Sequence, residues 1–181
     1  AIVGSYPEAL ARTTPRRRNA WLDSYLDLIV ERDAPDVVES RRLSDLPLTL
    51  RLLAARNSEE LNVSDMSSAT GIPATSLNRM LSLLETLYLV QRVPAWSTNL
   101  SKRVVSRPKM ALLDSGLAAR LINVTAAAVD PGMSGHLAGH LLEGFVAGEL
   151  RRQLGWCEEK IRISHYRDRS GAEVDLILET D

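Results

Sequence analysis

The chain has 181 residues, of which 45% are hydrophobic and 25% charged, and its formal net charge is −1. This length and composition allow one large or two small domains with a real core. The near-neutral charge excludes a strongly basic, non-specific DNA binder, so any contact with nucleic acid has to come from a local patch. Aromatic residues make up only 4%, which argues against a platform that stacks single-stranded bases.

The cellular compartment is indicated by features that the sequence lacks. A single cysteine, Cys157, excludes an internal disulfide and a cysteine-rich zinc site, and we expect it to be chemically inert. No apolar run is long enough to span a membrane, and no secretory signal is present. We therefore expect a cytoplasmic protein without a membrane partner. Because the chain starts without Met and stops at Asp181 within a predicted sheet, we also expect a piece of a longer protein.

Residues 1–42 predict a helical lead-in. Trp21 and Tyr25 lie at helical spacing before Asp33-Ala34-Pro35 ends the helix. The basic run Arg16-Arg17-Arg18 stands at the start of this helix, where positive charge opposes the helix dipole. A solvated helix start is the simplest interpretation, but the conflict with the dipole also indicates an acidic partner.

Residues 43–122 predict a winged helix-turn-helix. Three helical stretches follow one another, and their apolar faces comprise Leu46, Leu50, Leu53 and Ala54, then Val63, Met66 and Ala69, then Leu77, Leu81, Leu84 and Tyr88. Asn62 or Ser64 is placed to cap the second helix. Gly71-Ile72-Pro73 supplies a tight turn before the third, which we expect to run from about Ala74 to Tyr88.

A wing of two strands is expected to complete this unit. Residues 89–93 form an apolar and polar run that predicts the first strand, and Pro94 ends it. The wing itself would cover residues 97–103, and the chain would return through Val104 and Val105 towards a second strand at residues 110–113. The order helix, helix, glycine turn, helix, strand is typical of a helix-turn-helix with a wing.

The last third of the chain predicts a small α+β part. Asp114-Ser115-Gly116 begins a short helix to Leu121, and residues 123–134, rich in Ala, Gly and Pro, predict a linker. Within the final segment, 135–181, we expect a helix from Gly135 to Gln153 and then two strands, 161–167 and 172–178, around a turn at 168–171. The expected fold class is therefore mainly α with a small α+β part.

The third helix and the wing are the candidate nucleic-acid contacts. The outward positions of the helix are Thr75, Ser76, Asn78, Arg79 and Ser82, side chains that can bond base edges or phosphates. The wing adds the basic residues Lys102, Arg103, Arg107 and Lys109. Because fold alone does not fix function, a protein-docking or inter-domain module remains the alternative to duplex DNA.

Short fragments in a fixed order resemble the C-terminal region of a large group of prokaryotic AAA+ ATPases, a domain of unknown function that follows the nucleotide-binding core. The fragments are Gly4-Ser5-Tyr6-Pro7-Glu8, Trp21 with Tyr25, Glu31-Arg32-Asp33, Leu87-Tyr88-Leu89-Val90, Pro94-Ala95-Trp96, Pro108-Lys109, Asp114-Ser115-Gly116-Leu117, Leu142-Glu143, Glu149-Leu150, Tyr166-Arg167 and Glu173-Val174-Asp175. Each is weak alone, but their order and spacing together are fairly specific.

The resemblance implies an ATPase module upstream, with ATP and Mg²⁺ as cofactors of the full-length protein. The chain itself has no phosphate loop of the GxxxxGK[ST] form, so we expect no cofactor here and no ATP hydrolysis by this part alone. Residues 1–42 would lead in from that ATPase module, and the module or another protein would be a partner. The oligomeric state is left open.

The resemblance also implies that the last segment is an incomplete restriction-endonuclease-like, PD-(D/E)XK-type α/β fold. Glu143 matches the helical Glu of that fold and Asp175 the strand Asp, while the sequence stops before an acid-x-Lys strand. Glu173 shares the strand face of Asp175, and Val174, Leu176 and Leu178 take the other face. If Glu143 and Asp175 belong to a metal site, they must approach each other in space. The simpler interpretation is that the acidic side is the solvated face of an edge strand.

Two histidines precede this glutamate on the predicted helix. His136 and His140 lie four residues apart and Glu143 follows three residues later, so all three share a helix face, as zinc ligands could. The HExxH pattern is missing, and histidines on a helix surface are the expected outcome.

Three hypotheses for function follow. The first is a non-catalytic region of an AAA+-type ATPase that recognises DNA or a protein partner through the winged helix. The second is a metal-dependent nuclease of PD-(D/E)XK type that lacks its last strands. The third is a winged-helix transcription regulator, for which dimers with third helices one DNA turn apart would be required.

Overall fold

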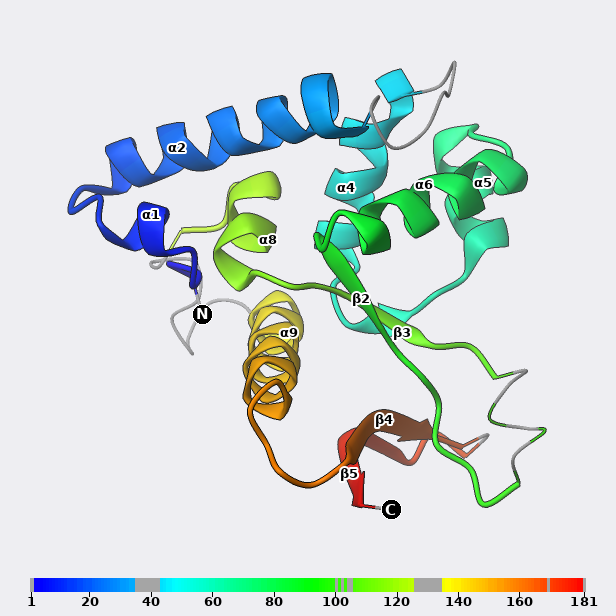
Figure 1. Ribbon diagram of the computed structural model, residues 1–181. Coiled ribbons are helices and arrows are strands. Elements are labelled where there is room, and N and C mark those ends of the chain that lie inside the picture. Colours follow the sequence, from blue (N-terminus) through cyan, green and yellow to red (C-terminus); the bar gives the residue numbers. More distant parts are fainter. Residues whose placement is uncertain are drawn as a thin grey trace.

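In the computed structural model, helices dominate and two small antiparallel sheets complete the fold (Figure 1). This confirms the predicted class, mainly α with a small α+β part. The structure describes residues 2–34, 43–99, 101, 103, 106–125, 135–168 and 170–180. Most of the predicted linker, 126–134, lies outside the described residues. No described helix combines the length and apolar character that crossing a membrane requires.

The N-terminal part is built from α1 (Pro7–Leu10), α2 (Pro15–Leu28) and a π-helical turn, η1 (Ile29–Asp33). Thr14 caps α2, because its hydroxyl accepts a hydrogen bond from the Arg17 N–H at 3.4 Å. Figure 1 shows α2 lying across α4 (Leu46–Ala55) and α8 (Ser115–Leu121). Leu22 and Ile29 belong to the same buried cluster as the residues of α4, so the predicted lead-in shares its core with the next unit.

Three helices and a three-stranded sheet follow, which we call the trihelical unit. Its members, after the short 3₁₀ turn η2 (Leu43–Asp45), are α4 (Leu46–Ala55), β1 (Glu59–Glu60), α5 (Val63–Thr70), α6 (Ala74–Thr86), β2 (Val90–Val93) and β3 (Lys109–Leu112). The antiparallel sheet has the order β1-β3-β2. Asn62 caps α5 by accepting from the Asp65 N–H at 3.2 Å, and Gly71 ends that helix at φ 71°. Both the cap and the glycine turn were predicted.

The end of α6 differs from the prediction. Leu77, Leu81 and Leu84 are fully buried as expected, but the helix ends at Thr86 and Tyr88 is 77% exposed. Tyr88 adopts a left-handed conformation with φ 55°, which turns the chain out of α6. Leu89, which is fully buried, fills the inner position instead, so the prediction that Tyr88 belongs to the apolar stripe was wrong.

Strand β2 is buried at a polar position as well as at its apolar ones. Gln91 is only 4% exposed, close to the values for Val90 and Val93. The reason is that β2 is covered on this side, where Gln91 and Val93 line a shared cavity with Ala147 of α9 (Gly135–Leu154) and Ile163 of β4 (Ile161–Arg167). The pattern of residues within β2 does not indicate that α9 and β4, which come much later in the chain, pack against it.

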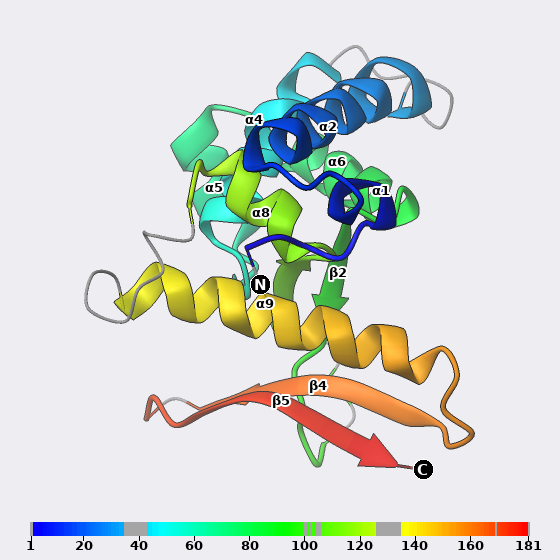
Figure 2. The ribbon, with the colours of Figure 1, turned by 90° about the vertical axis from the view of Figure 1, so that its left-hand side faces the viewer.

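The remaining elements are α8 (Ser115–Leu121), α9 (Gly135–Leu154), β4 (Ile161–Arg167) and β5 (Glu173–Thr180). Asp114 caps α8 by accepting from the Leu117 N–H at 2.7 Å, and it also accepts from the Ser5 N–H at 2.6 Å. Strands β4 and β5 pair antiparallel, with an irregularity between Ser164 and Tyr166. We call α9, β4 and β5 the hairpin unit; Figure 2 shows α9 running alongside the two strands.

The hairpin unit is fixed on the trihelical unit by backbone pairing and by Asn57. The Trp96 N–H donates to the His165 carbonyl at 2.6 Å, and the His165 N–H donates to the Pro94 carbonyl at 2.9 Å. The Asn57 side chain donates to the His140 carbonyl of α9 at 3.0 Å and accepts from the Leu112 N–H at 2.9 Å. Gly144 permits this approach, because a Cβ there would lie 2.1 Å from Asn57 Nδ2.

We expect Gly144→Ala to destabilise the fold by about 1–3 kcal/mol, because Asn57 would have to leave both of its hydrogen bonds. Gly139→Ala on the same helix is the matched control, since a Cβ there meets nothing within 4 Å. The control should gain up to about 1 kcal/mol from helix propensity. Urea unfolding of both variants measures the difference, and equal stabilities would mean that α9 does not approach Asn57 this closely.

Candidate functional site

The most concentrated set of charges in the described residues surrounds Lys109. Its ammonium lies 2.6 Å from Glu143 Oε1, 2.7 Å from Glu173 Oε1 and 3.1 Å from Asp175 Oδ1. We call these four residues the Lys109 cluster. The lysine comes from β3 of the trihelical unit, whereas the carboxylates come from α9 and β5 of the hairpin unit. The cluster therefore joins the two units.

Local structure explains how the four side chains meet. Lys109 is the first residue of β3 and lies opposite Glu60 of β1 and Val93 of β2 in the sheet. Glu173 and Asp175 are two residues apart on β5, so they share one face of that strand. Glu143 faces them from α9. The predicted approach of Glu143 and Asp175 is present in the structure, with the Lys109 ammonium between them.

Burial is uneven across the cluster. The side chains of Lys109 and Glu143 are 4% and 13% exposed, whereas that of Asp175 is 59% exposed. Burial alone would lower the pKa of Lys109, but its hydrogen bonds to the three carboxylates raise that pKa above its usual value. The lysine is thus an ammonium at every physiological pH. Removing one partner of such a pair typically costs about 3–5 kcal/mol, because the other charge stays buried.

The two faces of β5 do not divide simply into an apolar inner face and an acidic outer face. Val174 and Leu178 are 47% and 48% exposed, while the acidic side chains turn towards Lys109. The acidic side is thus partly solvated, as the simpler interpretation expected, and it also pairs with a buried ammonium, which that interpretation did not include. The physical reason is the ammonium, which makes the inward direction favourable for carboxylates.

A buried histidine lies beside the cluster. His165 is fully buried at the irregularity in β4, and its Nε2 lies 3.1 Å from the Arg107 carbonyl. Burial lowers the pKa of this imidazole, and the charge of Lys109 lowers it further, so the ring is neutral at pH 7. Within the described part of the chain, its Nδ1 has no hydrogen-bond partner.

A second ion pair joins the segment between β2 and β3 to the hairpin unit. Arg103 makes two bonds of 2.8 Å to the carboxylate of Glu179, and its guanidinium lies 5.6 Å from the ring centre of Trp96. The Trp96 Nε1–H also donates to Glu179 at 3.4 Å. These bonds, chiefly that from Arg103, lower the pKa of Glu179 to about 2. Arg103 was predicted as a DNA contact, but here its charge is used internally.

The other residues predicted to contact DNA differ in their exposure to solvent. Thr75, Asn78, Arg79 and Ser82 are exposed on α6, Ser76 is half-buried beside them, and Arg107 is exposed in the connection to β3. Lys102 lies outside the described residues. Lys109 was expected among the exposed basic residues of the wing and is instead 3% exposed, so that prediction was wrong. Its position at the start of a strand covered by the hairpin unit explains the difference.

In the structure, His140 and Glu143 have different partners. His140 Nε2 lies 3.7 Å from Glu59 Oε1 of β1, whereas Glu143 bonds to Lys109. The side chain of His136 lies outside the described residues. Over the described ranges, no group of three His, Cys, Asp or Glu side chains could hold a metal ion. The predicted pair Glu143 and Asp175 is bridged by an ammonium rather than arranged as an open ligand set.

Sequence reasoning missed the partners that lie far apart in the chain. Asn57, Trp96 and His165 position the hairpin unit, and none was singled out for this role. The one available signal for Lys109 was its place in the Pro108-Lys109 fragment, next to the apolar run that forms β3. Nothing in that fragment indicates that two of its partners, Glu143 and Asp175, are 34 and 66 residues away.

Comparison with known proteins divides the chain close to the border between the trihelical unit and the hairpin unit. Residues 1–128 match a domain of unknown function (DUF8612), and the chain belongs to this family. Residues 138–181 match a second domain of unknown function (DUF4143). Lys109 thus falls in the first matched segment, and its three carboxylate partners fall in the second. The Lys109 cluster links the two segments.

Two curated relatives are uncharacterized mycobacterial proteins. Mb2031c of Mycobacterium bovis and Rv2008c of Mycobacterium tuberculosis are each 24% identical to this chain in an alignment of 181 positions that covers 98% of the chain. The chain spans only 39% of the length of either relative. No solved structure matches it. The family and the relatives therefore place the chain without assigning it an activity.

We expect Arg103→Gln to raise the pKa of Glu179 from about 2 towards 4.5, because its two charge-assisted bonds are lost. Since the folded-state pKa is depressed, the stabilisation is present above pH 4.5 and disappears as the pH falls towards 2. Arg162→Gln is the matched control, because Arg162 is 3.7 Å away and largely exposed. Carboxyl ¹³C NMR titration measures both, and equal shifts would remove Arg103 as the main cause.

Proposed function

We propose that residues 43–122 contain a winged helix-turn-helix recognition module, that the module belongs to a longer AAA+-type ATPase, and that α6 contacts duplex DNA. The topology of the trihelical unit supports the first part. Three helices precede the antiparallel pair of strands β2 and β3. A short strand, β1, lies between the first and second helices, and the sheet order is β1-β3-β2. A helix-turn-helix of this kind places its second motif helix, here α6, at the partner.

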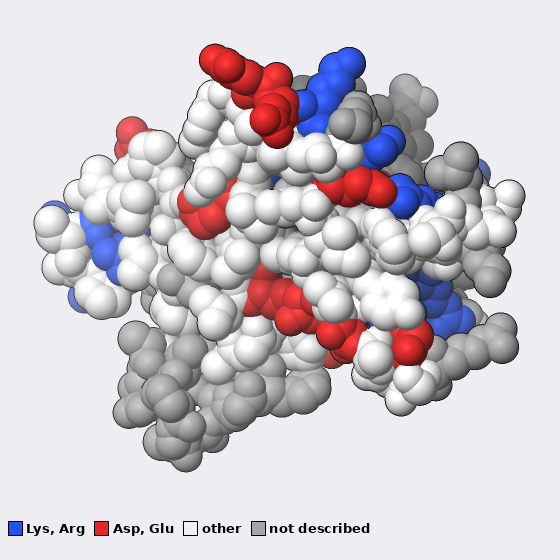
Figure 3. All heavy atoms as spheres, turned by 90° about the horizontal axis from the view of Figure 1, so that it is seen from below, with Lys and Arg blue, Asp and Glu red and all other residues white. Residues whose placement is uncertain are grey.

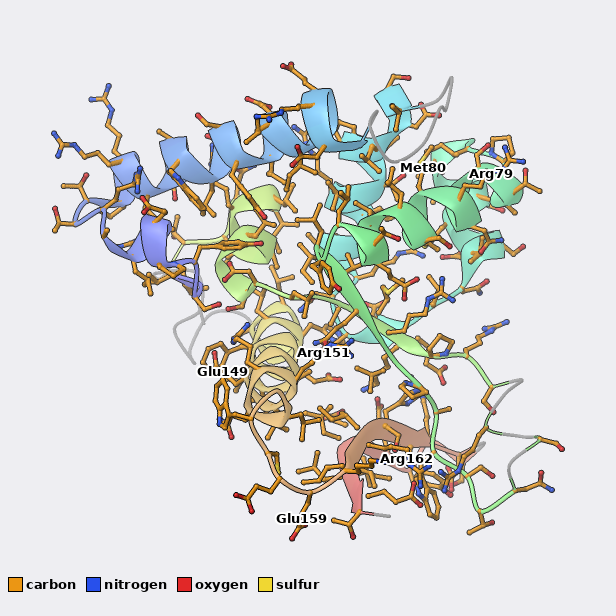
Figure 4. All side chains as sticks on the ribbon, in the orientation of Figure 1. Arg79, Met80, Glu149, Arg151, Glu159 and Arg162 are labelled. Atoms are coloured by element: carbon orange, nitrogen blue, oxygen red, sulfur yellow. The ribbon has the colours of Figure 1, made fainter. Side chains whose placement is uncertain are left out.

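The observation that carries the proposal is the two-sided character of α6. Its inner side is buried in the core through Leu77, Met80, Leu81, Leu83 and Leu84. Its outer side presents short polar groups and one cation, and Figure 4 shows Arg79 at the edge of the molecule, away from the hairpin unit. Asn78 and Arg79 are side chains suited to bidentate bonds with adenine and guanine edges.

Charge pairing limits how strong this contact can be. On the described surface around α6, Arg56 pairs with Asp65 and Arg92 with Glu85, and the wing residue Arg103 pairs with Glu179. Among the described side chains, Arg79 and Arg107 are cations near this unit without an ion pair. Few phosphate contacts give weak, salt-sensitive binding, so we propose recognition within a larger assembly rather than tight binding by this part alone.

The longer protein supplies the ATPase part of the proposal. The resemblance of the chain to the C-terminal region of AAA+ ATPases and the greater length of its relatives support it. ATP and Mg²⁺ would act in that upstream part, since this chain has no phosphate loop. The proposed role of this chain is to bring the ATPase module to its DNA or protein partner.

A metal-dependent nuclease is the rival function. The convergence of Glu143, Glu173 and Asp175 favours it, because hydrolysis of phosphodiesters uses clustered carboxylates. The ammonium of Lys109 at their centre weighs against it. Figure 3 shows acidic atoms in a band across the face seen from below, where β4 and β5 lie, and such a face repels a phosphate backbone. We therefore limit the proposal to recognition.

We expect the chain to bind duplex DNA weakly in low salt, and Arg79→Ala and Arg107→Ala each to lower the affinity and reduce the salt slope by about one unit. Arg17→Ala on α2 is the charge-matched control and should bind as the parent does. Fluorescence anisotropy across a salt series measures the slope. Loss of sequence preference with Arg79→Ala, but not with Arg107→Ala, would identify base reading by α6.

Two outcomes would overturn the DNA contact. Absence of binding by the parent in low salt would make α6 a protein-docking surface, the alternative that the near-neutral surface allows. Equal weakening by Arg17→Ala and Arg79→Ala would show only a non-specific effect of net charge. Size-exclusion chromatography on the same samples reports dimers, which the transcription-regulator hypothesis requires.

A further inference from the structure

We propose that the Lys109 ammonium takes the place of a divalent cation among Glu143, Glu173 and Asp175, and thereby clasps the hairpin unit to the trihelical unit. In this arrangement metal binding and clasping exclude each other. The same carboxylates become a divalent-cation site only when the ammonium is withdrawn. This inference concerns the border between the two units and does not depend on whether α6 contacts DNA.

The numbers of hydrogen-bond donors and acceptors support the proposal that Lys109 holds the hairpin unit on the trihelical unit. A lysine ammonium has three N–H donors, and here three carboxylate oxygens lie within 3.1 Å of the nitrogen. Every donor is therefore used within the chain. The three acceptors come from two elements of the hairpin unit, so one side chain of β3 fixes the positions of both α9 and β5.

The positions of the oxygens also explain why a metal and the ammonium exclude each other. Mg²⁺ and Ca²⁺ bind oxygen ligands at about 2.0–2.6 Å, slightly closer than the bonds around Lys109 Nζ. A cation shared by Glu143, Glu173 and Asp175 would occupy the point where the ammonium now lies.

The carboxylates depend on this lysine for neutralisation. Among the described side chains, Glu173 has one other cation nearby, Arg167, at 3.9 Å, and that side chain is 48% exposed. Burial and the charges of Asp175 and Glu173 raise the pKa of Glu143, and the bond to Lys109 opposes this rise. Without the ammonium, three carboxylates would share one site, an arrangement that proteins relieve by protonation or by binding a cation.

The first experiment compares the parent with Lys109→Met in buffer treated with a chelator and in millimolar Mn²⁺. The parent should bind no Mn²⁺ in isothermal calorimetry, and its Tm should be equal in both buffers. Lys109→Met should lose on the order of 10 °C in Tm without metal, because a buried carboxylate loses its partner. It should bind one Mn²⁺, which restores most of this loss, and Asp175→Asn in the Lys109→Met background should abolish that binding.

A second experiment is independent of whether Lys109→Met folds. Asp175→Asn weakens the clasp at its most exposed member, and Glu159→Gln, an exposed residue before β4, removes the same charge elsewhere in the chain. We expect hydrogen exchange to quicken in α9, β4 and β5 of Asp175→Asn, with α6 unchanged and with the control equal to the parent. This pattern reports release of the hairpin unit rather than general destabilisation.

Three results would overturn the inference. Binding of one Mn²⁺ by the parent, lost in Asp175→Asn, would show an ordinary metal centre beside Lys109. A Lys109→Met variant with the Tm of the parent would show that the ammonium does not hold the units together. Equal exchange rates in Asp175→Asn and Glu159→Gln would show that the carboxylate position is unimportant.

Discussion

The placement of the C-terminal hairpin depends on one buried ammonium. Lys109 is almost fully buried at the start of β3, and such a charge is tolerated only with paired carboxylates. This requirement brings α9 and β5 to the same edge of the trihelical sheet. The contacts of Asn57 and the backbone pairing of His165 then fit around that arrangement. A hydrophobic side chain at the same position would leave the acidic face of β5 without a partner.

The packing of the hairpin unit on the trihelical unit determines which surfaces of the trihelical unit remain exposed to partners. The hairpin unit covers one side of β2 and uses the charges of Lys109 and Arg103. The segment between β2 and β3, predicted as a wing, therefore contributes less positive charge to the surface than its sequence suggests. The outer side of α6 lies elsewhere and remains exposed. Under the proposed function, selectivity would then come from short polar side chains on α6 and little from phosphate attraction.

Helices and their ends could be predicted from the sequence because their causes are local. The stripe of Leu77, Leu81 and Leu84, the Asn62 cap and the Gly71 turn each depend on residues within one or two turns of helix. Tyr88 was misplaced because spacing alone cannot show where a helix stops when Leu89 competes for the same inner position. The prediction failed where two adjacent residues satisfied the same pattern.

The sequence indicated which charged side chains belong to the site, but it did not indicate which of them pair with each other. Glu143, Glu173 and Asp175 were recognised as one group, since two of them share a strand face and the family resemblance supplied the third. Their partner was not recognised, because a lysine 34 residues upstream of Glu143 leaves no periodic signal.

Arg103 and Glu179, which are 76 residues apart, show the same limit. A basic residue in a predicted wing suggests an external anion, yet the anion here belongs to the chain itself. The distinction matters for function, because a cation that is already paired must break that pair before it can bind a phosphate. The hairpin unit and a phosphate backbone would thus compete for Arg103. The Arg103–Glu179 bonds would favour the docked hairpin unless DNA contacts elsewhere outweighed their loss.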